Sequence, residues 1–375
     1  MHLIAAALLI IWLLLFIQTA ANLIFVPRLR ADQTPQQRLF VSIVIPARNE
    51  ARSIERTVRA FLAQDYSNFE VIVVNDRSSD GTGEILRSFN DSRLSIIDGT
   101  ETPQGWLGKP WALEQGRVRA RGELLLFVDA DLMYAPEALR AAVAELEAQD
   151  VGLLALWPFL EMRTFAEQVA MPMMSFFGFC ALPLWIANRS RSVWMGIGGG
   201  SGNLIRRTLL ESIGGFAPLR EAVVDDVALA RRARQAGART AVCRADDLVS
   251  VRMYHGSREI VEGFTKNVFA TFGRNYLWAS ANLMAMFVVH ILPYALALTG
   301  DVLAISAVVL ISVTRGVLFS TLRFRLDNAI FLHPFMVLFW AYIFVRSMWF
   351  TGVRNELHWR GRVYDAAATR FGAEQ

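Results

Sequence analysis

The sequence predicts an α/β fold with a mainly parallel sheet, joined to transmembrane helices at both ends of the chain. Between residues 38 and 277, short apolar runs alternate with helical segments, which is typical of parallel strands with helical crossovers. The chain of 375 residues is 54% hydrophobic, more than soluble domains usually are. Long apolar stretches account for this excess. We therefore expect an N-terminal transmembrane helix at 1–27, an α/β domain at 38–277, a C-terminal transmembrane region at 279–352 and a tail at 353–375.

The first apolar stretch, Leu3–Val26, has 24 residues and no charged side chain. Because a bilayer core needs about 20 residues, this stretch is predicted to be a membrane helix. A cleaved signal peptide with a cut near Gln18–Ala21 is the alternative, but the basic start of such a peptide is missing. The basic residues that follow the stretch are Arg28, Arg30 and Arg38. Since positive residues favour the inner side of a membrane, we expect the α/β domain to be cytoplasmic.

Four strands are expected in the first part of the α/β domain, each followed by a turn or helix. They are Leu39–Pro46, Phe69–Asn75, Arg93–Ile97 and a run from Leu124 to Val128. Amphipathic helices are expected from Ile54, from Glu84 and over Trp111–Arg119. Right-handed crossovers bring the carboxyl ends of parallel strands to one edge of the sheet. The acidic residues expected at that edge are Glu50, Asp76, Asp80 and Asp129.

The fourth strand ends at two carboxylates, Asp129 and Asp131. Ligands bind beyond the carboxyl ends of such strands, so both side chains should line a site. Two carboxylates this close repel each other unless a cation neutralises them, and Mg²⁺ or Mn²⁺ with a bound diphosphate would do so. The alternative is that an aspartate caps the following helix, in which Pro136 lies near the first turn.

Residues 165–190 form a second apolar stretch, which Pro172 and Pro183 interrupt. We expect a helix that lies in the membrane interface, with Arg189 and Arg191 reaching lipid headgroups. A helix buried in the soluble core is the alternative.

A glycine cluster, Gly198–Asn203, and an acid pair, Asp225–Asp226, follow. Glycines allow the backbone to approach a ligand closely, although the cluster could equally be a hinge, and it lacks the spacing of a dinucleotide fingerprint. The acid pair begins a helix that Gly237 should end. It could cap that helix or provide a catalytic base.

Three apolar segments near the C-terminus are each about long enough to span: Ala279–Leu298, Val302–Ser320 and Ala329–Gly352. Arg323 and Arg325 place the loop before the third segment inside. If the third segment also spans, the basic tail lies outside, against the charge rule. The dipeptide His333-Pro334 is consistent with a re-entrant or interfacial segment instead.

Charge and cysteine content exclude other classes of protein. The net charge of +4 is small and dispersed, so a nucleic-acid partner is not expected. Two cysteines suggest neither a disulfide framework nor a cysteine metal site. We expect a multi-pass protein of a bacterial-type inner or plasma membrane, with both the α/β domain and the tail at 353–375 in the cytoplasm.

Four short motifs resemble, in their order, the signature of family 2 glycosyltransferases of GT-A fold. That signature consists of a strand with Pro-x-x-Asn-Glu, an Asp-x-Ser-x-Asp turn, an Asp-x-Asp and a late acidic pair. The matching residues are Pro46–Glu50, Asp76–Asp80, Asp129–Asp131 and Asp225–Asp226. Each motif alone is weak, but their shared order makes the resemblance strong.

Further segments resemble the membrane-bound branch that glycosylates terpenoid lipids. That branch includes carotenoid glycosyltransferases of the diaponeurosporenoate and chlorobactene type and hopene-associated enzymes, with ceramide glucosyltransferases as more distant relatives. The segments are Gly105–Ala112, Arg252–Tyr254, Glu262–Asn267 and Trp359–Tyr364. The resemblance implies transfer of one sugar from a nucleotide-diphosphate sugar to a membrane lipid, such as a carotenoid or hopanoid.

The resemblance also implies roles for individual residues. The donor-binding residues would be Pro46, Asn49, Glu50, Asp76, Asp80, Lys109 and Asp129. Asp129 and Asp131 would organise Mg²⁺ or Mn²⁺ and the diphosphate, while Asp226, with Asp225 beside it, would deprotonate the acceptor in an inverting displacement. The candidates for acceptor or diphosphate contacts are Trp106, Gly200, Asn203, Arg252 and Lys266.

One motif of the wider family has no match. Processive and ceramide-type members carry Gln-x-x-Arg-Trp, which this sequence lacks, although Arg252 and Lys266 could substitute at the diphosphate. Single-sugar transfer is therefore favoured over a processive polysaccharide synthase or a ceramide-type glucosyltransferase. A non-enzymatic membrane scaffold would have lost some of the carboxylates, and all four motifs persist.

Overall fold

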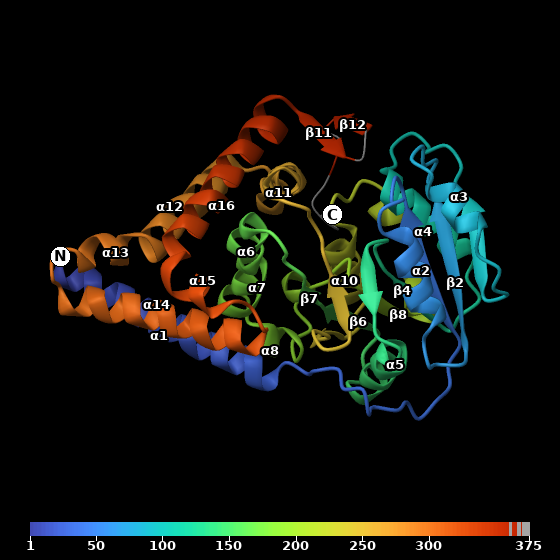
Figure 1. Ribbon diagram of the computed structural model, residues 1–375, viewed down its shortest axis with the longest axis horizontal. Coiled ribbons are helices and arrows are strands. Elements are labelled where there is room, and N and C mark those ends of the chain that lie inside the picture. Colours follow the sequence, from blue (N-terminus) through green and yellow to red (C-terminus); the bar gives the residue numbers. More distant parts are fainter. Residues whose placement is uncertain (360–361, 366–368, 370–375) are drawn as a thin grey trace. The chain divides into compact units, whose positions relative to one another are not determined.

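The computed structural model describes residues 1–359, 362–365 and 369, and the chain divides into two compact units (Figure 1). The α/β unit contains Pro27–Glu161 and Ile186–Met253. The helical unit contains Met1–Val26, Met162–Trp185 and the described residues from Tyr254 to Asp365. We describe each unit by itself. Part of the predicted tail at 353–375 lies outside the described residues.

A seven-stranded sheet forms the centre of the α/β unit, and its strand order is β3-β2-β1-β4-β8-β6-β9. Its strands are β1 (Val41–Ala47), β2 (Phe69–Asn75), β3 (Leu94–Asp98), β4 (Leu124–Phe127), β6 (Leu153–Trp157), β8 (Asn203–Arg206) and β9 (Thr240–Arg244). Only β8 runs antiparallel to its neighbours. The other pairs are parallel, which confirms the predicted mainly parallel sheet.

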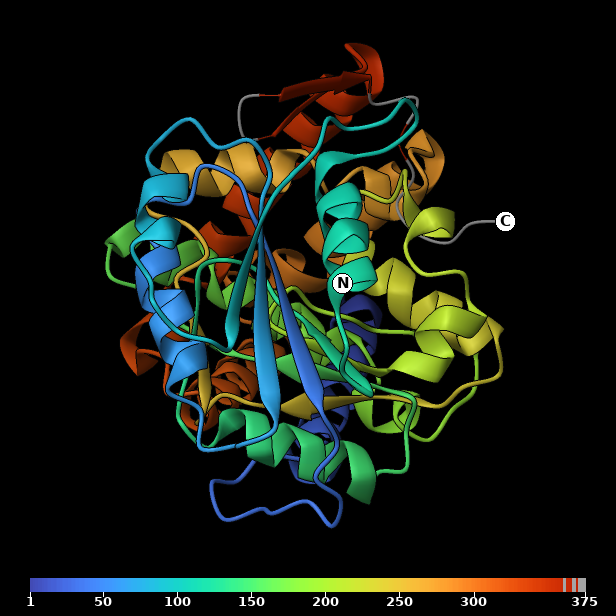
Figure 2. The same cartoon turned by 90° about the vertical axis from the view of Figure 1, so that its right-hand side faces the viewer.

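Helices flank this sheet (Figure 2). They are α2 (Ile54–Leu62), α3 (Thr82–Arg87), α4 (Gly108–Arg119), α5 (Ala138–Ala148), α9 (Arg207–Ser212) and α10 (Asp225–Gln235). Every residue of β2 and β4 is buried, as expected for strands covered on both faces. Helix α4 packs closely on β1 and β2 at Gly116, where a Cβ atom would lie 2.4 Å from Val44. This packing fixes the N-terminal end of α4 near the carboxyl edge of the sheet.

A second, three-stranded sheet lies beyond β4 in the same unit. It consists of β5 (Leu132–Tyr134), β10 (Val249–Val251) and β7 (Phe159–Leu160). Tyr134 of β5 donates a hydrogen bond of 2.5 Å to the carbonyl oxygen of Ser201, and its burial raises the pKa of the phenol. The small sheet thus supports the glycine cluster.

The helical unit contains four apolar helical stretches that are long enough to cross a membrane: His2–Phe25, Tyr276–Ala297, Val302–Thr321 and His333–Val353. Its helices are α1 (His2–Phe25), α6 (Phe165–Ala170), α7 (Pro172–Phe176), α11 (Ser257–Thr265), α12 (Tyr276–His290), α13 (Leu292–Ala297), α14 (Val302–Thr321), α15 (Leu326–Phe331) and α16 (His333–Ser347). Helix α8 (Leu184–Ala187) lies at the boundary of the units, and β11 (Glu356–Trp359) pairs with β12 (Arg362–Asp365).

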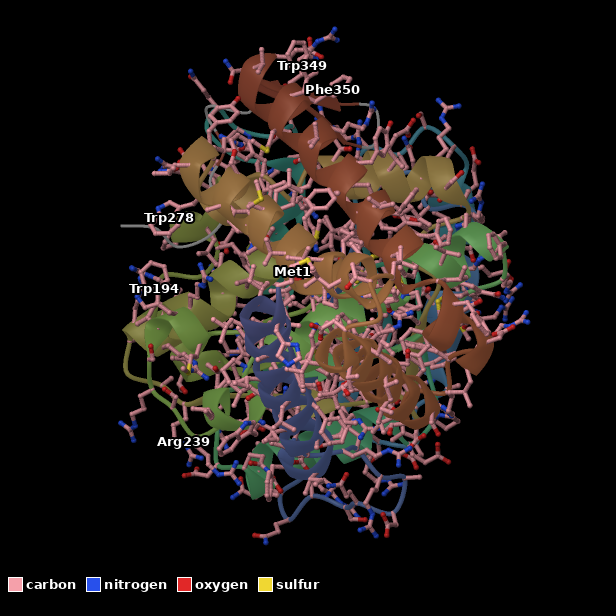
Figure 3. The ribbon with its side chains drawn as sticks, turned by 90° about the vertical axis from the view of Figure 1, so that its left-hand side faces the viewer. Met1, Trp194, Arg239, Trp278, Trp349 and Phe350 are labelled. Atoms are coloured by element: carbon pink, nitrogen blue, oxygen red, sulfur yellow. The ribbon has the colours of Figure 1, made fainter. Side chains whose placement is uncertain are left out.

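Many large apolar side chains of the helical unit are exposed, among them Trp278 and Trp349 (Figure 3). Leu277, Leu298 and Phe335 are exposed as well. Soluble units seldom expose apolar surface to this extent, so a lipid environment would suit these helices.

Most of the second apolar stretch, residues 165–190, belongs to the helical unit. Met162–Trp185 belongs to the helical unit, where Asn22 of α1 donates hydrogen bonds of 2.7 Å to the carbonyl oxygens of Phe179 and Leu182. Trp340 of α16 donates a hydrogen bond of 2.9 Å to Ala170. The segment therefore packs among the apolar helices of its own unit, and its position relative to a membrane remains a prediction. Its apolar side chains find burial on several sides, and side chains from two helices satisfy the carbonyl groups of the segment.

The last apolar stretch, His333–Val353, begins beside the middle of α1 and not beside one of its ends. His333, the first residue of α16, packs against Trp12, with ring centroids 5.9 Å apart. Just beyond the end of α16, the carbonyl oxygen of Met348 accepts a hydrogen bond of 3.3 Å from Tyr276, the first residue of α12. Helix α16 therefore runs beside α12, antiparallel to it, and ends near the residue at which α12 begins.

Candidate active site

Lys109 connects two acidic segments at the carboxyl edge of the sheet. Its Nζ atom lies 2.8 Å from Oδ1 of Asp129 and 3.2 Å from Oδ1 of Asp225. Lys109 is the second residue of α4, so the packing of α4 on β1 and β2 determines its position. The sequence suggested Lys109 as a nucleotide ligand, but it gave no indication that this lysine would bridge Asp129 and Asp225.

Asp129 occupies a narrow space beside the glycine cluster. Its backbone N–H donates a hydrogen bond of 2.9 Å to the carbonyl oxygen of Gly200. A Cβ atom on Gly200 would lie only 2.1 Å from Oδ2 of Asp129. Gly200 is thus needed for the position of this carboxylate, whose side chain remains 42% exposed and can meet a ligand.

Asp225 and Asp226 form the first turn of α10, where the helix dipole favours negative charge. Oδ1 of Asp226 accepts a hydrogen bond of 2.7 Å from the backbone N–H of Val227. Gly198 lies directly against this turn, because a Cβ atom there would be 2.1 Å from the carbonyl oxygen of Asp226. The glycine cluster therefore contacts both acidic segments, and sequence reasoning missed the contribution of Gly198.

The crowded charges shift the pKa values of this cluster. Burial raises the pKa of Asp225 to about 6, although its ion pair with Lys109 opposes the shift. Burial also raises the pKa of Asp226. For Lys109, burial would lower the pKa, but the surrounding carboxylates outweigh burial and hold the pKa well above its ordinary value. The lysine thus remains charged, and the carboxylates around it outnumber it.

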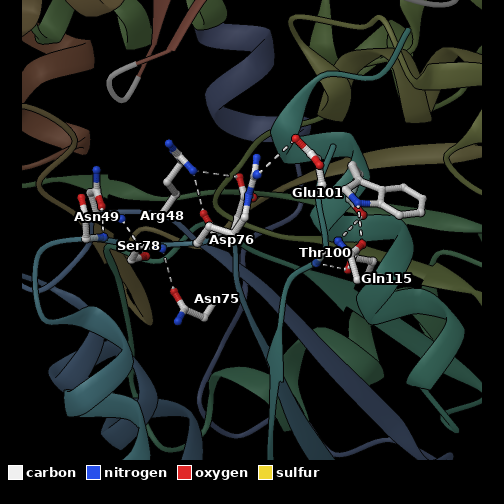
Figure 4. A network of polar contacts seen from close by, with 11 residues as sticks. Arg48, Asn49, Asn75, Asp76, Ser78, Thr100, Glu101 and Gln115 are labelled. Atoms are coloured by element: carbon white, nitrogen blue, oxygen red, sulfur yellow. Dashed lines mark hydrogen bonds and ion pairs between the residues drawn. The ribbon is translucent and has the colours of Figure 1, made fainter. Parts of the chain in front are cut away.

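The turns after β1 and β2 form a second polar region (Figure 4). Nη1 of Arg48 donates a hydrogen bond of 2.8 Å to the carbonyl oxygen of Asp76 and lies 3.8 Å from Oδ2 of its carboxylate. Nε of Arg77 lies 3.9 Å from Oδ1 of the same carboxylate. Asp76 itself is 3% exposed. Both arginines were missed by sequence reasoning, although Arg48 lies within the Pro46–Glu50 motif.

Asn49 and Arg77 have positive φ angles of 54° and 52°. This left-handed conformation is uncommon for residues other than glycine and is often found at functional sites. Ser78 stabilises the first turn, since its hydroxyl accepts a hydrogen bond of 3.0 Å from the N–H of Asn49. Asn49 in turn accepts a hydrogen bond of 2.9 Å from the N–H of Ser79. Pro46 lies within β1, opposite Val74.

Glu50 and Asp80 make local hydrogen bonds in these turns. Oε2 of Glu50 accepts a hydrogen bond of 3.0 Å from the hydroxyl of Ser53. Asp80 accepts hydrogen bonds of 3.0 Å from the N–H of Ala51 and 2.5 Å from the hydroxyl of Thr82. Partial burial would raise the pKa of Asp80, but these hydrogen bonds outweigh it and lower the pKa. Asp80 therefore joins the two turns.

Trp106 and Trp111 flank Lys109 and contact each other edge to face, with ring centroids 5.1 Å apart. Trp106 is partly buried against the hydrophobic core. The indole N–H of Trp111 donates a hydrogen bond of 3.2 Å to Thr100. The two rings form an apolar wall beside the charged cluster.

Asp131 lies in the turn between β4 and β5, two residues after Asp129. Among the described residues, no group of three or more His, Cys, Asp or Glu side chains is arranged to hold a metal ion. Two carboxylates with oxygen donors still fit Mg²⁺ or Mn²⁺, because these ions commonly take their remaining ligands from phosphates and water. A metal at Asp129 and Asp131 would therefore depend on the donor diphosphate for further ligands.

The remaining candidates do not all belong to this cluster. Asn203 is 3% exposed, and its Oδ1 atom accepts a hydrogen bond of 3.3 Å from Gly199, so it supports the glycine cluster. Arg252 follows β10 in the α/β unit. Lys266 caps the C-terminus of α11 in the helical unit.

Comparison with known proteins supports the resemblance seen in the sequence. The family described as "Glycosyl transferase family 2" matches residues 42–214. A 4,4'-diaponeurosporenoate glycosyltransferase of Staphylococcus aureus (strain USA300) is 25% identical over 347 residues, which cover 86% of this chain and 88% of that protein. The protein of the same name from strain MRSA252 is 24% identical with the same coverage.

Among solved structures, mannosyltransferase PcManGT from Pyrobaculum calidifontis, in complex with GDP-Man and Mn²⁺, has the same fold. Its TM-score is 0.58 at 22% identity, and the match covers 92% of this chain and 97% of that one. This likeness confirms the GT-A type of fold predicted from the sequence.

Proposed function

We propose that this protein moves one sugar from a nucleotide-diphosphate sugar to a membrane lipid, because residues 42–214 match the family 2 glycosyltransferases. The transfer inverts the configuration at the anomeric carbon. We place the reaction at the cytoplasmic face of a bacterial-type inner or plasma membrane, in a multi-pass protein. The acceptor is a terpenoid such as a carotenoid or hopanoid.

The observation that carries this proposal is the Lys109 bridge between Asp129 and Asp225. This bridge holds the carboxylate of Asp129, which follows β4, next to the acid pair of α10. The groups proposed to bind the sugar donor and to activate the lipid acceptor therefore lie close together. When the sugar leaves, negative charge grows on the diphosphate, and the ammonium group of Lys109 can stabilise that charge. Asp76 and the turns around it offer the nucleotide a rigid polar surface.

Asp226 is the proposed base. The acceptor oxygen attacks the anomeric carbon, the bond from that carbon to the diphosphate oxygen breaks, and the nucleoside diphosphate leaves with the electron pair. The acceptor proton passes to Asp226, whose raised pKa makes it a better proton acceptor than an ordinary aspartate. Asp225 positions Lys109 and does not act as the base while this ion pair persists.

Asp129 and Asp131 would hold Mg²⁺ or Mn²⁺ together with the diphosphate. A divalent ion supplies charge neutralisation at the leaving oxygens. The solved mannosyltransferase of the same fold contains GDP-Man and Mn²⁺, which supports a sugar nucleotide and a divalent ion here.

A lipid acceptor is supported by two independent features. The Staphylococcus aureus relative is named for 4,4'-diaponeurosporenoate, and the helical unit has four stretches that could cross a membrane. A lipid of this kind leaves the bilayer at a cost of about 0.8 kcal/mol per exposed methylene, so transfer at the membrane surface is favoured.

The test is to incubate the purified full-length protein, in detergent and with Mn²⁺, with candidate sugar nucleotides and a total lipid extract. We expect a lipid product whose mass has increased by one sugar residue, and no such product with Asp226→Asn. A ladder of products with many sugars would instead indicate a processive synthase. Hydrolysis of the sugar nucleotide with no glycosylated lipid would contradict the proposed acceptor class.

A further inference from the structure

Two proline interruptions meet in the helical unit. Helix α12 ends at His290 and α13 begins at Leu292 with Pro293 in its first turn, and Pro334 follows His333 at the start of α16. Because proline has no N–H, the carbonyl oxygen of Val289 loses its helical donor. The indole N–H of Trp12 in α1 replaces that donor, with a hydrogen bond of 2.8 Å. The interruption is therefore a built feature, which a side chain from another helix completes.

A chain of hydrogen bonds runs through this meeting point. Nη1 of Arg315 in α14 lies 3.1 Å from Nδ1 of His333, and Nε2 of His333 lies 3.2 Å from Nδ1 of His290. Arginine can only donate, so Nδ1 of His333 accepts and its Nε2 carries the hydrogen. That hydrogen is donated to His290, whose own Nε2 then carries a hydrogen and donates onward. Because the arginine can only donate, it determines the direction in which each hydrogen bond of this series is donated.

This chain lies deep among apolar side chains. Trp12, near the middle of the 24-residue α1, packs on His290 and His333 with ring centroids 5.2 and 5.9 Å apart. Trp12, Arg315 and His333 are all 0% exposed. Ionisable side chains at such depth in membrane proteins usually mark functional sites, and interrupted helices often carry them.

The far end of the chain is less deeply buried than its start. His290 retains 9% exposure, and Tyr294, one turn further along, is only partly buried. The hydroxyl oxygen of Tyr294 is buried and has no hydrogen-bond partner among the described residues. The ring of Tyr294 stacks on His333 at 6.1 Å, so this hydroxyl belongs to the same cluster. Buried polar atoms without a partner are rare and indicate an absent water or ligand.

We propose that His290 and Tyr294 bind an oxygen atom of a lipid, with a carboxylate favoured over a neutral oxygen. Both side chains can donate hydrogen bonds to that atom, and the guanidinium of Arg315 polarises the chain that ends at His290. The proposal rests on the membrane position proposed above, but it does not depend on sugar transfer.

The test uses the full-length protein in detergent and two probes, 9,10-dibromostearic acid and its methyl ester, which quench nearby tryptophan fluorescence. Because the chain has 10 tryptophans, the signal of Trp12 is obtained as the difference between the wild type and Trp12→Phe. We expect the acid to quench Trp12 at lower concentrations than the ester. Equal quenching by acid and ester would overturn the proposal and leave the cluster as a water site.

Two kinds of variant sharpen this test. Tyr294→Phe removes one hydroxyl and should weaken binding of the acid about fivefold, while Tyr342→Phe, at an exposed tyrosine of α16, should have no effect. The glutamine in His290→Gln can still accept a hydrogen bond from His333 and donate one to the lipid oxygen. This variant should therefore keep part of the preference for the acid over the ester, which His290→Leu should lose. An unchanged preference in both Tyr294→Phe and His290→Leu would contradict the site. Binding of the sugar nucleotide should be the same in all four variants, so failure here is distinct from failure of the glycosyltransferase function.

Discussion

The two polar regions at the edge of the α/β sheet are built in different ways. At Asp80, backbone and hydroxyl groups donate to the carboxylate and lower its pKa, while two arginines lie near the carboxylate of Asp76. Around Asp225 and Asp226, several carboxylates surround one lysine, and burial raises their pKa values. The first region is complete without a ligand, whereas the second has excess negative charge and should respond strongly to a cation.

The largest effects should come from the acids of the second region. Asp226→Asn and Asp131→Asn should each lower kcat by roughly 10²–10⁴, the usual contribution of a positioned base or charge stabiliser. Nucleotide affinity, measured by calorimetry with and without Mn²⁺, should distinguish them. In Asp131→Asn, the nucleotide affinity should no longer depend on Mn²⁺. In Asp226→Asn, the nucleotide affinity should be retained, because a base acts only when the acceptor attacks. Equal nucleotide affinities would show that these two roles are wrong.

Gly200→Ala tests how closely the glycine cluster must approach Asp129. A Cβ atom at Gly200 would lie 2.1 Å from the Asp129 carboxylate, whereas at Gly199 its nearest neighbour would be 3.8 Å away. Displacing a catalytic group by about 1 Å can cost on the order of 100-fold in rate. We therefore expect a loss of that size for Gly200→Ala and near wild-type rates for the matched Gly199→Ala. Similar rates for both variants would mean that the position of Asp129 is not critical.

Lys109→Met should have opposite effects on two ligands. Without nucleotide, Mn²⁺ should bind more tightly, because the ammonium no longer competes for Asp129. The sugar nucleotide should bind about tenfold more weakly or worse, because a charged hydrogen bond to the diphosphate is lost. Electron paramagnetic resonance of free Mn²⁺ and nucleotide titrations measure the two effects, with Lys109→Arg as the control that keeps the charge. Weaker Mn²⁺ binding in Lys109→Met would contradict competition.

Asp225 should make stability depend on pH. Its pKa of about 6 lies above the value of about 3.9 in an unfolded chain. Its stabilising contribution is therefore complete below the unfolded pKa and is lost as the pH rises through 6. The melting temperature of Asp225→Asn, relative to that of the wild type, should therefore increase as the pH rises from 4 to 8. For Asp150→Asn, at an exposed residue, the difference from the wild type should not increase. A constant difference across this range would argue against the shift.

The smallest effect is expected in the first region. Asp80→Ala removes three local hydrogen bonds and should lower the free energy of unfolding by about 1 kcal/mol, with kcat little changed. Chemical denaturation and steady-state rates provide the two measurements. A collapse of nucleotide affinity would show instead that Asp80 contacts the donor.

The pattern of apolar runs was enough to predict β1 to β4 and the edge at which Asp76 and Asp129 lie, but β6, β8 and β9 were not predicted. Every residue of β2 and β4 is buried, and this burial leaves a clear signal in the sequence, whereas β3 is only partly buried. The bridge from Lys109 to Asp225 could not be predicted, because it depends on how closely α4 packs at Gly116. The assignment of 162–185 to the helical unit also depends on distant partners, since Asn22 satisfies carbonyl groups roughly 160 residues away along the chain.

The first helix has a consequence for how this protein can be handled. Trp12 and Asn22 donate to the carbonyl oxygens of Val289, Phe179 and Leu182, in two other segments of the helical unit. A truncated protein that begins at Pro27 would remove the side-chain donors of all three oxygens, although Leu182 would keep the N–H of Leu184. Each oxygen left without a donor in apolar surroundings costs about 1–3 kcal/mol. Removal of the first helix to obtain a more soluble protein should therefore yield aggregates, and fusion partners are better attached at the C-terminus.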